Sequence, residues 1–192
     1  MTLTVEPHVY QWTRDEYYKM AEAGLFHGKH VELIEGQVIA MSPMGSRHRT
    51  ATTLTGDVLR LVFRQGYFVS IQGPLVLGDI SEPEPDVAGI AGNVRDYTDA
   101  HPTTAALAVE VADTSLAYDR TTKMSLYAKV GIPEYWIVNL IARQLEVYRR
   151  PIVDVTQLYG FGYAEVTICT AAERITPLAI PEATIAVADM LP

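Results

Sequence analysis

The sequence is poor in cysteine and lacks a membrane-spanning run. Its 192 residues include a single cysteine, Cys169, which excludes an internal disulfide and a cysteine-rich metal site. We interpret Cys169 as a small core residue. No stretch reaches the roughly 20 apolar residues that a membrane helix needs, and residues 1–10 lack the basic and apolar pattern of a secretory signal. We therefore expect a cytoplasmic protein without a membrane partner.

Basic residues are also in short supply. The chain has 15 Lys and Arg residues against 23 Asp and Glu residues, a formal net charge of -8. Because phosphate neutralisation needs clustered Lys and Arg, this balance argues against a surface that coats nucleic acid nonspecifically. Binding of DNA must then be local or shared within an oligomer. Zinc-enzyme motifs and glycine-rich phosphate loops are absent from the sequence as well.

The chain has enough apolar residues for one core. Hydrophobic residues make up 48% of the 192 positions, but the length falls short of what two domains usually take. No repeat or low-complexity linker marks a boundary. We expect a single domain over residues 1–192, with a core at about 12–150 and a β-rich C-terminal extension at 151–192.

Two local patterns predict a helix and a hairpin near the start of the chain. Thr13 followed by Glu16 is a capping box, and Gly24 ends the short helix that it begins. Two apolar runs flank Glu35 and Gly36 at the spacing of a tight β-hairpin.

The rest of the pattern predicts an α/β fold, a mixed central β-sheet flanked by helices. A second helix is expected from residue 46 to Gly66, since apolar residues recur at three- and four-residue steps at Ala51, Leu54, Val58, Leu61 and Val62. Strands are expected at residues 67–73, 75–77, 87–90, 105–111, 135–140 and 145–148, and a third helix at residues 120–130. Beyond residue 151 the pattern is β-like but irregular.

Two carboxylates stand against apolar runs. Asp86 opens the run at residues 87–90, and Glu110 interrupts the run at residues 105–111. Desolvating an unpaired charge is costly, whereas Mg²⁺ binds one or two carboxylates and keeps water and phosphate in its other positions. For either residue alone, a solvated strand end or an ion-pair partner is at least as good an interpretation as a metal ligand. The pair favours a metal site at Asp86 and Glu110.

Pro85-Asp86 followed by Glu110 resembles the PD-(D/E)XK motif of restriction-endonuclease-like proteins. A longer series resembles the Uma-type family of that superfamily. It comprises residues 31–36 (VELIEG), 41–43 (MSP), His48, residues 83–86 (PEPD), 109–111 (VEV), Asp119, Lys123 and residues 131–136 (GIPEYW). The resemblance covers about residues 12–150. It implies the restriction-endonuclease-like fold and hydrolysis of DNA phosphodiester bonds that depends on Mg²⁺ or Mn²⁺.

The lysine of the general motif is displaced in this chain. The motif places it two residues after the glutamate, on the same strand face, where the sequence has Ala112. The family pattern places a lysine in the following helix, which Lys123 matches. The resemblance implies that Lys123 reaches Glu110 from that helix, and we expect an exposed side chain whose loss leaves the fold intact. Without the resemblance, a solvated helical lysine is the simpler interpretation.

Four other polar residues are expected to lie near the carboxylates or to stabilise the elements that carry them. The resemblance implies that Glu32 is an accessory acid near the metal. His48, near the start of the second helix, is expected to bond a substrate phosphate or the nearby carboxylates, although a structural histidine is the commoner case. Gln72 is expected to face the same site, and Asp119 to cap the third helix.

These expectations define a metal-dependent endonuclease. Asp86, Glu110 and Lys123 should converge on one cleft with Glu32 at its edge. We expect DNA as the substrate and a homodimer, with the segment from Val153 onward in the contact. Two alternatives stay open: a catalytically silent nucleic-acid-binding or protein-interaction domain that kept the fold, and a metal hydrolase that is not a nuclease.

Overall fold

The computed structural model describes residues 7–192, which form two compact units. The first unit ends at Pro43 and includes Val76–Pro83, and the second comprises Met44–Leu75 and Glu84–Pro192. Residues 1–6, part of the segment interpreted as lacking a secretory signal, lie outside the described residues. The expectation of a single domain stays a prediction.

The N-terminal helix of the first unit has the predicted cap. Helix α1 (Arg14–Glu22) follows Thr13, whose hydroxyl accepts a hydrogen bond from the backbone N–H of Glu16. The Glu16 carboxylate accepts one in return from the Thr13 N–H, at 2.9 Å. This reciprocal pair is the capping box that the sequence predicts, so the prediction is confirmed.

The hairpin of the first unit also forms as predicted. Strand β1 (Val31–Ile34) pairs antiparallel with β2 (Gln37–Ala40). The two turn residues have positive φ angles, 48° at Glu35 and 75° at Gly36, as the tight turn of a two-residue hairpin requires.

The second unit is built on a six-stranded mixed sheet in the order β3-β4-β5-β6-β7-β8. Its strands are β3 (Tyr67–Ile71), β4 (Val87–Ala91), β5 (Leu107–Ala112), β6 (Glu134–Asn139), β7 (Gln144–Val153) and β8 (Phe161–Thr170). Only β5 and β6 run parallel within this order. A parallel pair needs a crossover, which here is a helical segment made of α3 (Leu116–Tyr118), the π-helical turn η2 (Asp119–Lys123) and α4 (Met124–Lys129). The predicted α/β class is confirmed.

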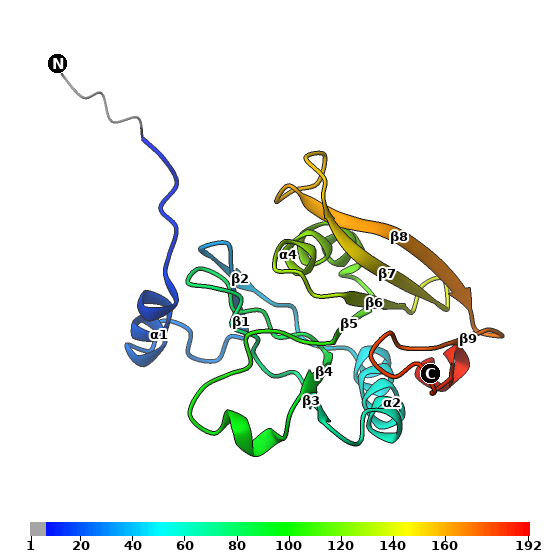
Figure 1. Cartoon of the computed structure of the whole chain (residues 1–192). Coiled ribbons are helices and arrows are strands. Elements are labelled where there is room, and N and C mark those ends of the chain that lie inside the picture. The colour runs from blue at the N-terminus through cyan, green and yellow to red at the C-terminus, as the bar shows by residue number, and fades with distance from the viewer. Residues whose placement is uncertain (1–6) are drawn as a thin grey trace. The chain divides into compact units, whose positions relative to one another are not determined.

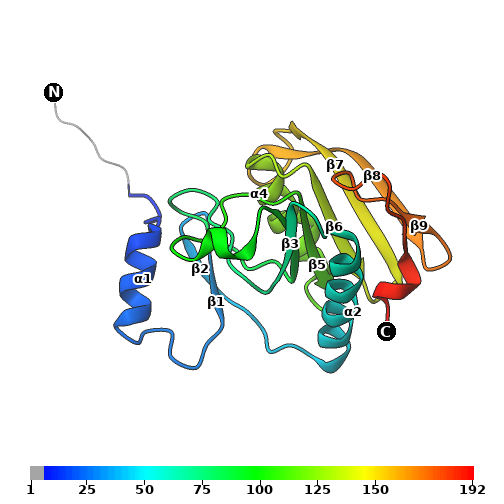
Figure 2. The same cartoon turned by 60° about the horizontal axis from the view of Figure 1, so that its bottom comes forward.

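Helices cover the two faces of this sheet (Figures 1 and 2). Helix α2 (Ser46–Val62) packs on the face that carries Val109 and Val111, in the main hydrophobic core. Because side chains alternate along a strand, Glu110 and Ala112 point to the opposite face, which the segment containing α4 covers. The sheet therefore separates the main hydrophobic core from a face that holds buried polar groups.

The buried stripe of α2 differs from the prediction at one end. Leu61 is 65% exposed, because it lies two residues beyond the buried Leu59 and so about 200° around the helix. The helix also ends at Val62, before Gly66. Gly66, with φ of 76°, lies in the turn that leads into β3.

One predicted strand does not form, and one predicted helix begins earlier than expected. Residues 75–77 form no strand: Leu75 and Leu77 are buried, but the chain leaves the sheet at Gln72, whose φ is 49°. The helical segment after β5 begins at Leu116 rather than residue 120. Asp119 therefore lies inside that segment and does not cap it.

The C-terminal part is more regular than predicted. Strands β7 and β8, of ten residues each, form a hairpin that continues the sheet, with Pro151 opposite Tyr163. The boundary expected at residue 151 thus falls inside β7. Cys169 is buried in the core, as predicted. The remaining short elements are η1 (Val94–Tyr97), β9 (Arg174–Ile175), β10 (Ile185–Ala186) and η3 (Val187–Met190).

Across residues 7–192, no helix has both the length and the apolar character that crossing a bilayer requires.

Candidate active site

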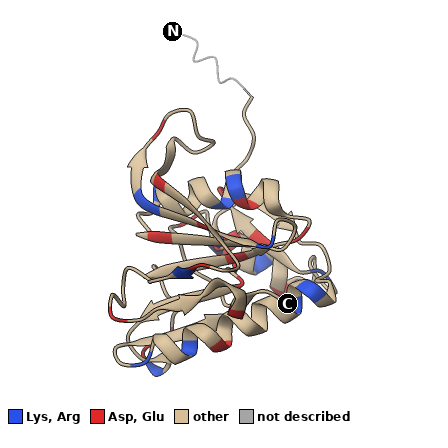
Figure 3. Ribbon diagram, turned by 90° about the vertical axis from the view of Figure 1, so that its right-hand side faces the viewer, with Lys and Arg blue, Asp and Glu red and all other residues tan. Residues whose placement is uncertain are grey.

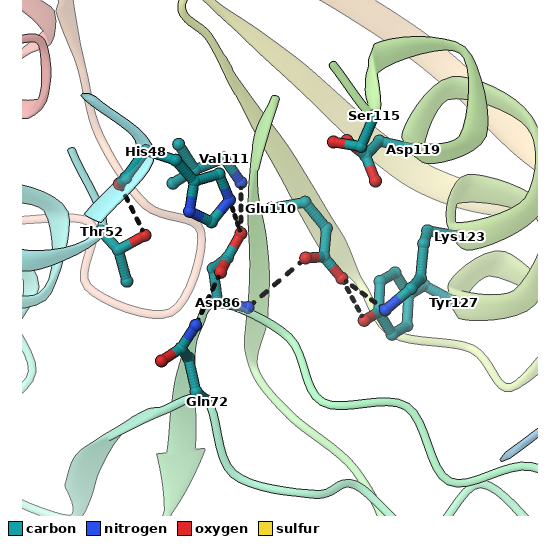
Figure 4. A network of polar contacts seen from close by, with 10 residues as sticks. All are labelled: His48, Thr52, Gln72, Asp86, Glu110, Val111, Ser115, Asp119, Lys123 and Tyr127. Atoms are coloured by element: carbon teal, nitrogen blue, oxygen red, sulfur yellow. Dashed lines mark hydrogen bonds and ion pairs between the residues drawn. The ribbon is translucent and has the colours of Figure 1, made fainter. Parts of the chain in front are cut away.

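Asp86 lies where β4 begins, and its carboxylate continues the hydrogen bonding of the sheet. The ladder between β4 and β5 ends with Val87 opposite Val109. Beyond that pair, the Val111 N–H of β5 donates a hydrogen bond to Asp86 Oδ2 at 2.8 Å (Figure 4). Pro85 precedes Asp86 and has no N–H to extend the strand. The strand end therefore fixes a buried carboxylate beside β5.

Two side chains from other elements hold Asp86. His48, in the first turn of α2, places Nε2 3.0 Å from Asp86 Oδ2. Gln72 donates its backbone N–H to the Asp86 carbonyl at 3.1 Å and its Nε2–H to Oδ1 at 3.4 Å. Burial lowers the pKa of His48, whereas the hydrogen bond to Asp86 and the charge of Asp86 raise it. The raising effects together outweigh burial, so the pKa of His48 is above its usual value. Both supporting residues thus contact the predicted site.

Glu110 lies beside Asp86 on the face that the helical segment covers. Its Oε1 accepts hydrogen bonds from Lys123 Nζ at 3.1 Å and from the Tyr127 hydroxyl at 2.7 Å. Its Oε2 lies 3.4 Å from the backbone nitrogen of Asp86. The structure therefore brings Asp86, Glu110 and Lys123 together (Figure 4). Their catalytic roles stay predictions.

Lys123 differs from the exposed lysine that the sequence suggests. Its side chain is 1% exposed and forms an ion pair with Glu110, whose side chain is 7% exposed. Removing one partner of a buried ion pair commonly costs about 3–5 kcal/mol, because the other charge stays buried. The expectation of an exposed Lys123 is therefore wrong, and we now expect loss of Lys123 to lower the stability of the fold.

The helical segment presents three polar residues at four-residue steps. Lys123 and Tyr127 contact Glu110, and Asp119 lies at the start of the π-helical turn that ends at Lys123 (Figure 4). Asp119 is 3% exposed and accepts a hydrogen bond from Ser115 Oγ at 2.6 Å. Burial raises the pKa of the Asp119 carboxyl to about 6, against the opposing effects of Ser115 and Lys123.

The sequence predicts neither Tyr127 as a site residue nor the burial of Asp119. The signal that could have found Tyr127 is its spacing, since it stands one helical turn after Lys123. Asp119 was interpreted as a cap because the helical segment was predicted to begin after it.

Glu32 lies on β1 of the first unit. It pairs opposite Ile39 and is 1% exposed. Its assignment as an accessory acid near Asp86 and Glu110 stays a prediction.

Two carboxylates are the candidate metal donors. Within residues 7–192, no group of three or more His, Cys, Asp or Glu side chains is arranged to hold a metal ion. Asp86, at the start of β4, and Glu110, in the adjacent strand β5, supply carboxylate oxygens. Mg²⁺ is commonly bound through one or two carboxylates and keeps several waters, so two carboxylates are the kind of donor set that this ion uses.

The six-stranded mixed sheet with helices on both faces defines a protein of the restriction-endonuclease-like α/β class. The family model described as "Uma2: Putative restriction endonuclease" matches residues 14–188, and the chain belongs to this family. No curated protein matches the chain.

A solved structure supports the fold assignment. It is described as "a putative nuclease belonging to DUF820 from Anabaena variabilis ATCC 29413". The two structures superpose with a TM-score of 0.69 over 93% of this chain and 96% of that chain, at 14% sequence identity. Similarity at this level of identity identifies a shared fold.

Proposed function

We propose that this protein is an endonuclease that hydrolyses DNA phosphodiester bonds with Mg²⁺, or Mn²⁺ in its place. The observation that carries the proposal is the buried group of Asp86, Glu110 and Lys123, in which Glu110 contacts both the Asp86 backbone and the Lys123 ammonium. Membership of the Uma2 family supports nucleic acid as the substrate class.

In this proposal Asp86 and Glu110 are the metal-binding residues. When bound, the ion supplies an activated water and offsets charge on the phosphate. Lys123 holds an ammonium 3.1 Å from Glu110 Oε1, where it adds a positive charge to the phosphate-binding region. His48 and Gln72 keep the Asp86 carboxylate in place, and Glu32 is the proposed accessory acid.

The test is nicking of supercoiled plasmid DNA by the purified chain, with and without Mg²⁺. We expect metal-dependent nicking by wild type and loss of nicking in Asp86→Asn, which changes the charge and keeps the size of the side chain. The matched control is Asp57→Asn on α2, since the Asp57 side chain is 64% exposed and paired with Arg60. Equal nicking by wild type and Asp86→Asn refutes the proposal.

A second candidate is a silent nucleic-acid-binding or protein-interaction domain. It is favoured by the lack of a three-ligand group among residues 7–192, and by the hydrogen-bond donors that already contact Asp86 and Glu110. Binding of DNA without metal-dependent cleavage in the same assay favours this candidate.

We also propose that the protein acts as a homodimer. Basic and acidic residues are interspersed along the described part of the ribbon (Figure 3), and the net charge is -8, so a second copy would extend the limited basic surface. Strand β8 is at the edge of the sheet, with Val166 55% and Ile168 46% exposed. Light scattering at micromolar concentration should give twice the chain mass, and a monomer contradicts the proposal.

A further inference from the structure

We infer that Tyr127 is a positioning residue whose hydroxyl fixes the orientation of the Glu110 carboxylate at the site. The inference deepens the proposed function and rests on it only for the consequence on metal binding. The side-chain geometry stands without a metal.

Tyr127 and Lys123 bind the same carboxylate oxygen from successive turns of the helical segment. The Tyr127 hydroxyl donates to Glu110 Oε1 at 2.7 Å, and Lys123 Nζ lies 3.1 Å from that oxygen. The Tyr127 side chain is fully buried. Two donors on Oε1 direct the other oxygen, Oε2, toward the Asp86 backbone, 3.4 Å away.

Without Tyr127, the Glu110 carboxylate would keep Lys123 on Oε1 and the long contact of 3.4 Å between Oε2 and the Asp86 nitrogen. The last torsion of a glutamate side chain has a broad energy profile, so a carboxylate held by these two contacts can rotate more freely than one held by three. The Lys123 side chain is itself long and flexible. The tyrosine ring is rigid and packs at 5.1 Å from the Tyr135 ring. Its hydroxyl therefore supplies a fixed second donor to Oε1.

Packing alone does not account for the hydroxyl. Tyr127, Tyr135, Tyr148 and Tyr163 form a cluster of rings on this face of the sheet. A phenylalanine would fill the space of the Tyr127 ring equally well. Elsewhere in the cluster, the Tyr163 hydroxyl donates to the Ile132 carbonyl at 2.8 Å, which is an ordinary way to satisfy a buried hydroxyl.

The hydrogen bond from Tyr127 therefore holds the Glu110 carboxylate in one orientation before a metal ion binds. Residues that orient a ligating side chain commonly change metal affinity or activity by roughly 10–100-fold when mutated. Tyr127 makes this contact through one hydroxyl group. Its removal should therefore weaken metal binding with little change in packing.

The experiment compares Tyr127→Phe with wild type and with Tyr163→Phe. The control removes a hydroxyl from the same cluster and leaves Glu110 untouched. Mn²⁺ binding to the full chain without DNA is measured by calorimetry, thermal melting is recorded, and metal-free crystal structures are determined. We expect the dissociation constant for Mn²⁺ to rise at least about tenfold in Tyr127→Phe and to stay unchanged in Tyr163→Phe.

The crystal structures separate this inference from the proposed function. In metal-free Tyr127→Phe, the distance from Glu110 Oε2 to the Asp86 nitrogen should change by about 0.5 Å or more, the tolerance within which a working site is held. A Glu110 side chain that stays in place overturns the inference, whatever the metal result. A displaced Glu110 together with a wild type that binds no Mn²⁺ supports the positioning role and refutes the metal-dependent function.

Loss of folding would not leave the question open. If Tyr127→Phe fails to fold, the same comparison is made in the Asp119→Asn background, which removes a buried charge. An unchanged Glu110 orientation and unchanged Mn²⁺ affinity in that background overturn the inference.

Discussion

Asp119→Asn should stabilise the protein at neutral pH and lose that advantage in acid. The Asp119 side chain is buried, and its pKa is raised from 3.8 to about 6. Between these two values the folded chain binds more protons than the unfolded chain, so stability falls as the pH rises through this window. Above pH 6 the folded protein therefore carries a buried carboxylate at a cost that an amide does not have.

The size of the effect follows from the shift. A rise of about two pKa units corresponds to roughly 3 kcal/mol at 1.36 kcal/mol per unit. The amide that replaces the carboxylate must itself be buried, although its oxygen can still accept the hydrogen bond from Ser115, so we expect a net gain of about 1–3 kcal/mol. For a chain of this size that is on the order of 2–10 °C in melting temperature.

The assay is denaturant unfolding of the metal-free protein at pH 7.5 and at pH 4, with Asp57→Asn as the control for loss of an exposed carboxylate. The variant should be the more stable protein at pH 7.5, and the difference should shrink toward pH 4. A variant that is less stable than wild type at pH 7.5 refutes the reasoning, because ionised Asp119 would then stabilise Lys123 by more than its burial costs.

Three further predictions concern Lys123, His48 and Gly89. Lys123→Ala should abolish cleavage and lower the melting temperature, and the swap Lys123→Ala with Ala112→Lys should recover part of both; wild-type-like cleavage in the single variant contradicts the assignment. In metal-free protein, the loss of stability caused by His48→Gln should be largest below pH 6.5. A raised histidine pKa stabilises the folded protein with His48 protonated, and that stabilisation disappears as the pH rises through the folded-state pKa. A loss of stability that grows with pH contradicts this prediction. Gly89→Ala should lower the unfolding free energy by about 1–3 kcal/mol, since its Cβ would lie 2.8 Å from the Phe63 ring; an unchanged denaturation midpoint contradicts this.

Local signals in the sequence were sufficient for the elements that depend on adjacent residues. The capping box of Thr13 and Glu16 and the turn at Glu35 and Gly36 are set by residues a few positions apart, and both form. Glu110 was identified as a charge inside an apolar strand, and it is buried in β5. These features need no knowledge of distant contacts.

The environment of Lys123 depended on tertiary contacts that no local pattern shows. The π-helical turn η2 changes the helical register between α3 and α4, so the facing side cannot be read from a regular 3.6-residue period. Lys123 is buried with its ammonium paired to Glu110, a residue 13 positions earlier in the chain. A lysine in a helix is usually solvated, and that general expectation failed here.

The dependence of plasmid nicking on Mg²⁺ concentration, measured in wild type and Glu110→Gln, is the direct test of metal-dependent cleavage at this site. Glu110→Gln keeps the shape of a side chain that contacts Lys123, Tyr127 and the Asp86 backbone, and it removes the negative charge. We predict that wild type nicks at a rate that rises with Mg²⁺ and saturates, while Glu110→Gln shows no nicking above the no-protein background at any concentration. Nicking by Glu110→Gln at the wild-type rate, or wild-type nicking that persists in excess chelator, would contradict it.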